Sequence, residues 1–242
     1  MNVLNISRLT KNHSHLRGLT LLELLVVIAI VSLLAIVCVV QPARDIRTRA
    51  TRFQCVNNLK QVGLDCMIWE GDHRGRFPMA VLETNGGTME LTAGPYAFRH
   101  FQVMSNELIT PKLVLCPGET DRNRILAKNF SQFSNSNLSF FIGTTVTNEC
   151  TPNMILSGDH NVTNGASIKN AVLNLTPNQP VGWTTEMHKN AGNIALADGS
   201  VQQVSRVGLQ TLVDSPQVTI DCNTSLTNGP AVARLQMPVL GQ

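Results

Sequence analysis

One carboxylate interrupts an otherwise apolar stretch near the start of the chain. Glu23 is the only charged residue between Leu19 and Val40. As a helix, these twenty-two residues would span roughly 33 Å, the thickness of the hydrocarbon core of a bilayer. A carboxylate in such a helix is costly, so it marks a functional site. Glu23 is therefore the first candidate functional residue. Its expected role is to form an ion pair through its carboxylate.

A second candidate lies near the C-terminus, where nine residues separate His188 from Asp198-Gly199. Asp-Gly between two alternating segments predicts a β-hairpin with a type I′ turn. We expect the His188 side chain to hydrogen-bond a backbone group or Asp198 where the strands meet. A metal site would have to recruit Asp159 and His160 as well. The oxygen-rich spacing of a calcium loop is not evident, and no CxxC pair indicates zinc, so no metal and no cofactor are predicted.

Catalysis has little support in the sequence. Ser157 beside Asp159-His160 is the only arrangement that resembles a hydrolase fragment. No nucleophile elbow, phosphate-binding loop or paired-carboxylate motif accompanies it. We therefore predict no enzymatic activity and no catalytic residue.

One long helix must position these groups. Beyond the apolar run, hydrophobic residues recur at steps of four, three, four and three, which predicts an amphipathic continuation. They are Cys55, Leu59, Val62, Cys66 and Trp69. The predicted helix covers residues 19–70, apolar on all sides in its first half, and Pro42 should kink or interrupt it.

The rest of the chain reads as a small antiparallel sheet, which gives an α+β fold. Strands are expected at 113–116, 138–146, 154–156 and 182–187, and as a hairpin at 193–204. Ser205 is expected to cap a short helix at 207–213. The tail from Asp214 reads as a loop.

The charge balance indicates topology and argues against nucleic-acid binding. Residues 1–18 contain three of the 19 basic residues and no acidic one, which leaves 16 basic against 16 acidic residues. A basic N-terminal segment predicts a cytoplasmic N-terminus and an external C-terminal domain. Four arginines at positions 44–52 lie on the predicted external side and run against this orientation. Without a net charge beyond residue 18, no nucleic-acid partner is expected.

The segment Arg17-Gly18-Leu19-Thr20-Leu21-Leu22-Glu23, with the apolar run behind it, resembles the processing site of type IV prepilins and type II secretion pseudopilins. The resemblance implies a leader (1–18), a transmembrane and fibre-core helix (19–41) and an extracytoplasmic pilin-like domain (42–242). A prepilin peptidase would cut between Gly18 and Leu19 and methylate the new N-terminus. The long helix would pack on the sheet, as in pilins.

The implied function is structural: a subunit of a type II secretion pseudopilus or a type IV pilus-like fibre. Glu23 would neutralise the N-terminal amine of a neighbouring subunit and so fix the register of the fibre. The implied partners are the peptidase, other pilin or pseudopilin subunits and an inner-membrane assembly platform. The protein would start in the inner membrane with its domain in the periplasm and end in a periplasmic or surface fibre. The alternative is a membrane-anchored ligand-binding module that uses the leader only for export.

Cysteines outside the membrane run would lie in an oxidising compartment, so one or two disulfides are expected. Cys55 and Cys66 are eleven residues apart, about 16 Å along a helix, and cannot bridge each other. Each can reach a loop cysteine, and Cys116 and Cys150 are the candidates.

Short motifs over residues 55–204 resemble one subgroup of pilin-like proteins. They include Asn58-Leu59-Lys60-Gln61, Cys116-Pro117 and the pattern of His188, nine residues and Asp198-Gly199. We expect this last pattern to be architectural, with Asp198-Gly199 setting the hairpin.

Overall fold

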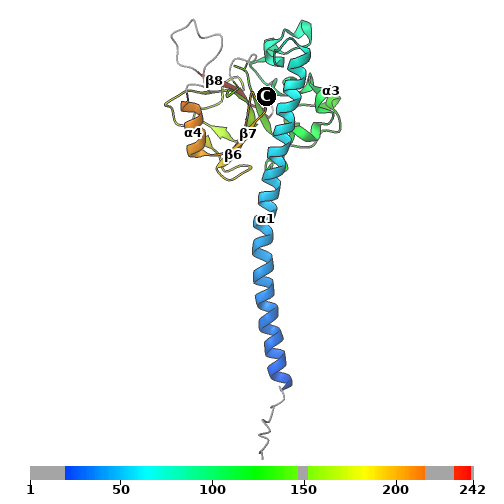
Figure 1. Ribbon diagram of the computed structural model, residues 1–242, viewed down its shortest axis with the longest axis vertical. Coiled ribbons are helices and arrows are strands. Elements are labelled where there is room, and N and C mark those ends of the chain that lie inside the picture. The colour runs from blue at the N-terminus through cyan, green and yellow to red at the C-terminus, as the bar shows by residue number, and fades with distance from the viewer. Residues whose placement is uncertain (1–19, 147–151, 216–231, 241–242) are drawn as a thin grey trace, which may run out of the picture. The chain divides into compact units, whose positions relative to one another are not determined.

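The computed structural model describes residues 20–146, 152–215 and 232–240 (Figure 1). Helix α1 (Leu21–Asp72) begins the described chain. Two compact units are formed by Met1–Arg47 and Thr48–Gln242, and α1 contributes residues to both. The helix does not end at Pro42, so the interruption predicted at this proline is wrong.

The second unit is built on an antiparallel sheet of six strands in the order β4-β8-β1-β2-β6-β7. Its strands are β1 (Phe140–Gly143), β2 (Ile155–Asp159), β4 (Val172–Leu175), β6 (Ala191–Leu196), β7 (Val201–Ser205) and β8 (Ala233–Gln236). A separate two-stranded sheet pairs β3 (Val162–Thr163) with β5 (Gly182–Trp183). The long helix and the antiparallel sheet confirm the predicted α+β, pilin-like fold class.

Short helices complete the second unit. The α-helices are α2 (Ala97–Gln102), α3 (Ser105–Leu108) and α4 (Arg206–Asp214). The 3-10 helices are η1 (Pro78–Ala80), η2 (Glu83–Asn85), η3 (Met89–Leu91), η4 (Pro111–Val114), η5 (Phe130–Gln132) and η6 (Asn135–Asn137). In the view of Figure 1, α3 and α4 lie on opposite sides of the second half of α1.

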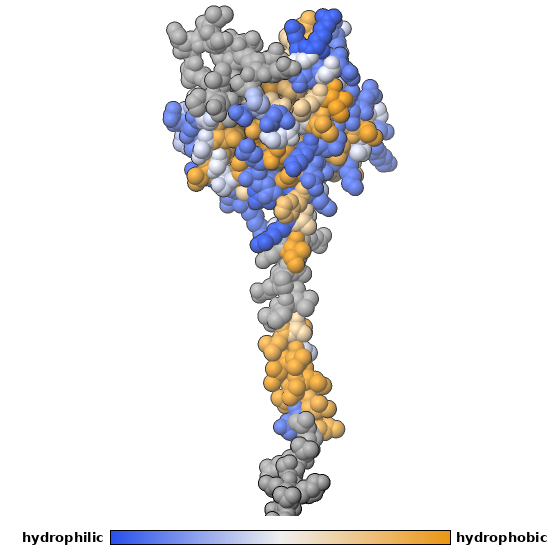
Figure 2. Space-filling model, in the orientation of Figure 1, coloured by the Kyte–Doolittle hydropathy of each residue, from blue (hydrophilic) through white to orange (hydrophobic). Residues whose placement is uncertain are grey.

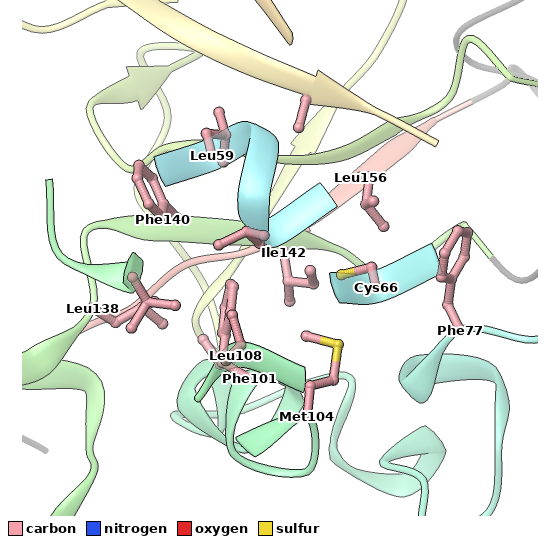
Figure 3. Packing of buried hydrophobic residues seen from close by; sticks show 14 of the residues in the cluster. Leu59, Cys66, Phe77, Phe101, Met104, Leu108, Leu138, Phe140, Ile142 and Leu156 are labelled. Carbon is pink, nitrogen blue, oxygen red and sulfur yellow. The ribbon is translucent and has the colours of Figure 1, made fainter. Parts of the chain in front are cut away.

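Both faces of the central strands β1 and β2 are buried, and the side chains of β1 alternate between two cores. Phe140 and Ile142 join a core formed with the second half of α1, α2 and α3, which Figure 3 shows from close by. Phe141 points into the other core, which contains Leu209 and Val213 of α4. In the first core, Leu59 of α1 is fully buried, and the whole predicted stripe of α1 from Cys55 to Trp69 belongs to it.

Two elements that local sequence signals predicted, the cap of α4 and the β6–β7 hairpin, are present, and the turn of the hairpin differs in type from the prediction. Ser205 caps α4 by accepting a hydrogen bond from the Gly208 amide at 3.2 Å, as predicted. The hairpin β6–β7 is also confirmed. Its turn is not type I′, because Gly199 has a positive φ of 78° and Asp198 does not. A type I turn followed by a left-handed glycine accounts for the observed bonds from Gly199 N to Leu196 O and from Leu196 N to Ser200 O.

Two strand predictions were wrong. Residues 113–116 begin in η4 and continue as irregular chain that lies in no strand. The tail expected to be a loop contains β8, which pairs with β1 and with β4 near the middle of the sheet. β4 itself was not predicted.

Candidate functional site

The first turn of α1 is capped and carries the lone carboxylate. Thr20 accepts a hydrogen bond from the Glu23 amide on its side-chain oxygen at 3.2 Å. Its carbonyl accepts another from the Leu24 amide at 3.1 Å. This is the N-cap of a Ser/Thr-x-x-Glu sequence, and an acidic residue in the first turn is also favoured by the helix dipole. Gly18 and Leu19, the predicted processing site, lie outside the described residues.

Apolar side chains line the visible face of this part of α1 in Figure 2, and none of the large apolar side chains from Leu21 to Ile36 is buried. From Leu21 to Ile36, the large apolar side chains are between 49% and 81% exposed. Ser32 satisfies its hydroxyl within the helix by donating to the Ala29 carbonyl. Among the described residues, the Glu23 carboxylate has no hydrogen-bond or ion-pair partner. A contiguous apolar surface of this size marks a site of protein or membrane interaction.

The Asp198-Gly199 turn packs on the second half of α1. Gly199 faces Gly63 so closely that a Cβ on Gly63 would lie 3.3 Å from the Gly199 Cα atom. A Cβ on Gly199 itself would lie 2.9 Å from the sulfur of Met67. The Asp198 side chain accepts a hydrogen bond from the Ser200 amide at 2.8 Å, which holds the turn. The turn is therefore a docking point between the hairpin and the helix.

His188 is not bonded to Asp198. Its Nε2 atom lies 3.4 Å from Oδ2 of Asp159 and 3.5 Å from Sγ of Cys116. Gly118 permits this approach, because a Cβ at that position would lie 2.8 Å from the imidazole. Burial, and next the charge of Arg52, lower the pKa of His188 to about 4, so the ring is neutral at pH 7.

A strained loop presents His188. The neighbouring residues Met187, Lys189 and Asn190 all have positive φ angles, which cost free energy for residues other than glycine. Asn161 holds the loop by donating from its side-chain amide to the carbonyls of Thr184, Glu186 and Ala191, at 3.0 to 3.3 Å.

Cys55 and Cys116 form a disulfide, with their Cα atoms 5.0 Å apart. The bond joins α1 to the chain that follows η4. Cys66 is a buried free thiol, and burial raises its pKa. Cys150, the other candidate partner, lies outside the described residues.

Asp159 is completely buried beside His188, and only one of its two carboxylate oxygens accepts hydrogen bonds. Its Oδ2 atom accepts hydrogen bonds from the Asn193 amide at 2.7 Å and from the Asn193 side chain at 2.9 Å. Its Oδ1 atom has no hydrogen-bond partner among the described residues. Burial raises the pKa of Asp159 to about 7 despite the bonds from Asn193.

A second buried polar network lies next to this group. Glu119 accepts hydrogen bonds from His160 at 2.9 Å and from Ser139 at 2.7 Å. Burial alone would raise the pKa of Glu119, but the hydrogen bond and charge of His160, with the hydrogen bonds from the Asp121 amide and Ser139, together outweigh burial and lower the pKa to about 2. Arg124 lies 3.6 Å from the same carboxylate and also donates to the Pro238 carbonyl at 2.8 Å. The network therefore ties the C-terminal segment to the loop after Cys116.

Ser157 and His160, which resemble a hydrolase fragment in the sequence, do not form a nucleophile–base pair. Ser157 donates its hydroxyl to the Phe141 carbonyl at 2.7 Å, and His160 is engaged by Glu119. The two side chains lie in different networks, so the arrangement offers no activated nucleophile.

Sequence reasoning placed Glu23, Cys55, Cys116 and His188 among the candidates. It named Cys116 as one candidate disulfide partner of Cys55 but did not associate His188 with either cysteine. It expected Asp198 near His188, whereas the structure supplies Asp159 and the disulfide. Arg52 and Gly118 were missed, although Gly118 belongs to a Cys-Pro-Gly sequence that predicts a tight turn.

Comparison with known proteins gave one family match. The model of the prokaryotic N-terminal methylation motif matches residues 14–39. The match supports a type IV pilin-like protein that is processed and membrane-anchored, and it suggests a structural, non-enzymatic role. No curated protein and no solved structure matches the chain. Within residues 20–146, 152–215 and 232–240, no helix is long and apolar enough to cross a membrane.

Proposed function

We propose that this chain is a structural subunit of a pilin-like fibre, either a type II secretion pseudopilus or a type IV pilus. It is made as a precursor whose leader, residues 1–18, is removed between Gly18 and Leu19 by a prepilin peptidase, which also methylates the new N-terminus. The motif match over residues 14–39 supports this proposal, because it covers the cleavage site and Glu23 together.

The observation that carries the proposal is a single unpaired carboxylate in the first turn of an exposed apolar helix. Glu23 lies four residues after Leu19, about 6 Å along a helix. Once the leader is removed, a free ammonium stands at Leu19, and neither this charge nor that of Glu23 is well solvated among apolar side chains. Pairing the carboxylate of one subunit with the amine of the next relieves both costs and sets the axial register of the fibre.

The remainder of the chain follows from this arrangement. Residues 19–41 anchor the precursor in the inner membrane with a cytoplasmic N-terminus and later form the core of the fibre. Residues 42–242 form the extracytoplasmic domain. The partners are the peptidase, other pilin or pseudopilin subunits and the assembly platform of the inner membrane. No catalytic residue is assigned.

Two measurements test the proposal. Mass spectrometry of the protein purified from its own membranes should show a chain that begins at N-methylated Leu19. In the same strain, Glu23→Ala should leave the protein processed and in the membrane but remove it from the sheared fibre fraction. Ser32→Ala is the matched control, because Ser32 is the other polar side chain of the run and is satisfied internally; it should assemble normally.

An intact Met1 terminus would refute processing. Normal assembly of processed Glu23→Ala protein would refute the charge-pairing role. If processed wild-type protein never enters fibres, the alternative of a membrane-anchored ligand-binding module replaces the proposal.

A further inference from the structure

Three side chains with metal-binding atoms converge inside the second unit, away from Glu23, and a fourth lies against one of them. The sulfurs of Cys55 and Cys116 and one ring nitrogen of His188 all lie within 4.8 Å of one another, and all three residues are buried. The Asp159 carboxylate lies against the same imidazole at 3.4 Å. The residues come from α1, the chain after η4, the strained 186–190 loop and β2.

We propose that the reduced form of the Cys55–Cys116 disulfide is a binding site for one divalent cation of the zinc type. The two thiolates and the His188 imidazole supply three ligands, and the Asp159 carboxylate supplies the fourth. The cysteine pair thus has two stable states, a covalent bond between helix and loop and a metal bridge between the same segments. This inference does not depend on the proposed role in a fibre.

The distances between ligand atoms fit a tetrahedral ion. Zinc binds sulfur at about 2.3 Å and imidazole nitrogen at about 2.0–2.1 Å, which separates tetrahedral sulfur and nitrogen ligands by about 3.5 Å. His188 Nε2 lies 3.5 Å from Cys116 Sγ. Tetrahedral nitrogen and oxygen ligands lie about 3.3 Å apart, and the observed distance from His188 to Asp159 is 3.4 Å. The two sulfurs must move by side-chain rotation after the bond between them is broken, and the Asp159 carboxylate must move toward them, because it lies outside the group of atoms that are within 4.8 Å of one another.

The surroundings suit thiolates and a metal. The Gly118 amide already donates to Cys116 Sγ at 3.3 Å, a hydrogen bond that is stronger to a thiolate than to a disulfide sulfur. Oδ2 of Asp159, the oxygen nearest to His188, also accepts the two hydrogen bonds from Asn193, which would orient a carboxylate ligand. Two thiolates and a carboxylate carry three negative charges, one more than the two positive charges of the ion. The positive charge of Arg52, which acts on Asp159, offsets this excess negative charge.

Reduction and metal entry have a route. A surface pocket lined by Gln54, Asn58, Lys112 and Pro117 reaches Cys116. A water-soluble phosphine gives two electrons to the disulfide and becomes its oxide with an oxygen atom from water, while the two sulfurs take the two protons of that water. In a cell a dithiol does the same by exchange and becomes a disulfide itself. Metal binding then releases two thiol protons to solvent.

The test uses the full chain in detergent, reduced with the phosphine in the presence of Co²⁺ or Zn²⁺. Reduced protein should bind one Co²⁺ with the visible bands of a tetrahedral ion and a sulfur-to-cobalt charge-transfer band, and Zn²⁺ should abolish these at one equivalent. Oxidised protein should show neither band. The melting temperature of reduced protein should be higher with Zn²⁺ than with a chelator.

Variants separate the proposed ligands from the rest of the core. Cys55→Ser and His188→Ala should weaken Zn²⁺ binding at least tenfold, in line with lost coordination. His188→Cys restores a ligand and should keep the tetrahedral spectrum. Cys66→Ser is the matched control, since Cys66 is a buried thiol outside the cluster; its spectrum should be unchanged.

The proposal is overturned if reduced wild-type protein gives no tetrahedral cobalt spectrum, or if Zn²⁺ leaves the melting temperature of the reduced protein unchanged. It is also overturned if Cys66→Ser loses as much affinity as Cys55→Ser. Unchanged binding in folded His188→Ala would remove His188 from the ligand set. Circular dichroism of each oxidised or metal-bound variant establishes which ones are folded.

Discussion

Acid should destabilise the second unit through His100. This side chain is completely buried, with Nδ1 2.6 Å from the Thr88 hydroxyl and Nε2 2.6 Å from the side-chain oxygen of Gln236. Gln236 lies in β8 and donates in turn to the carbonyls of Leu91 and Gly94. Burial lowers the pKa of His100 from 6.5 to about 4. The neutral ring therefore belongs to the folded state.

The sign and size of the effect follow from linkage. Below pH 6.5 the unfolded chain binds a proton at this position that the folded chain does not bind until about pH 4. The stabilising contribution is thus fully present above pH 6.5 and is lost as the pH falls toward 4. A pKa difference of this size is worth about 3 kcal/mol. That is a large share of a typical unfolding free energy of about 5–15 kcal/mol.

Urea unfolding of the full chain in detergent measures the loss, with the buried Trp69 and Trp183 as fluorescent reporters. The comparison is between wild-type protein and His100→Gln, which cannot be protonated. His188 has a lowered pKa and acts in the same direction as His100, whereas the raised pKa of Asp159 acts in the opposite one. Both groups are present in both proteins, so the difference between the two pH profiles isolates His100.

Wild-type protein should lose about 3 kcal/mol more than His100→Gln between pH 6.5 and 4. Parallel profiles would refute the reasoning, because they would mean that His100 is protonated as easily in the folded chain as in the unfolded one.

Three further changes should alter stability in predictable amounts. Replacing Cys55 and Cys116 together by alanine opens a loop with a sequence separation of 61, which the chain-entropy model values at about 4 kcal/mol, measurable by urea unfolding. Gly199→Ala forces a side chain into a backbone with φ of 78° and against the Met67 sulfur, and should cost about 1–2 kcal/mol or more in the same assay. Asn161→Ala leaves three carbonyls of the His188 loop without their donor and should cost about 1–3 kcal/mol, with faster amide exchange confined to residues 184–191. An Asn161→Ala protein with wild-type stability and exchange would show that the loop is held by other contacts.

The features that the sequence predicted correctly are specified by neighbouring residues. The stripe from Cys55 to Trp69 follows the period of a helix, and the whole stripe is buried in one core. Ser205 stands directly before α4 and caps it. Such signals need no information about distant parts of the chain.

The errors concern structure that depends on distant partners. β8 has the sequence Ala-Arg-Leu-Gln, without a β-branched or aromatic residue, so its composition does not favour a strand. It is extended because β1 and β4 pair with it on both sides. The cysteine and histidine cluster was missed for a related reason: its members are separated by 61 residues and by 72 residues, and no short spacing marks them.

The position of β8 determines when the domain can be completed. A chain leaves the ribosome from its N-terminus, so residues 233–236 appear after every other strand of this sheet, although they lie between β1 and β4 in the finished sheet. Until they arrive, β4 lacks the strand that joins it to the rest of the sheet, and β1 has an open edge that can pair with another chain. The six-stranded sheet can therefore be completed only after its C-terminal strand has been made, and a stop codon just before Ala233 would leave the other five strands synthesised but the sheet divided.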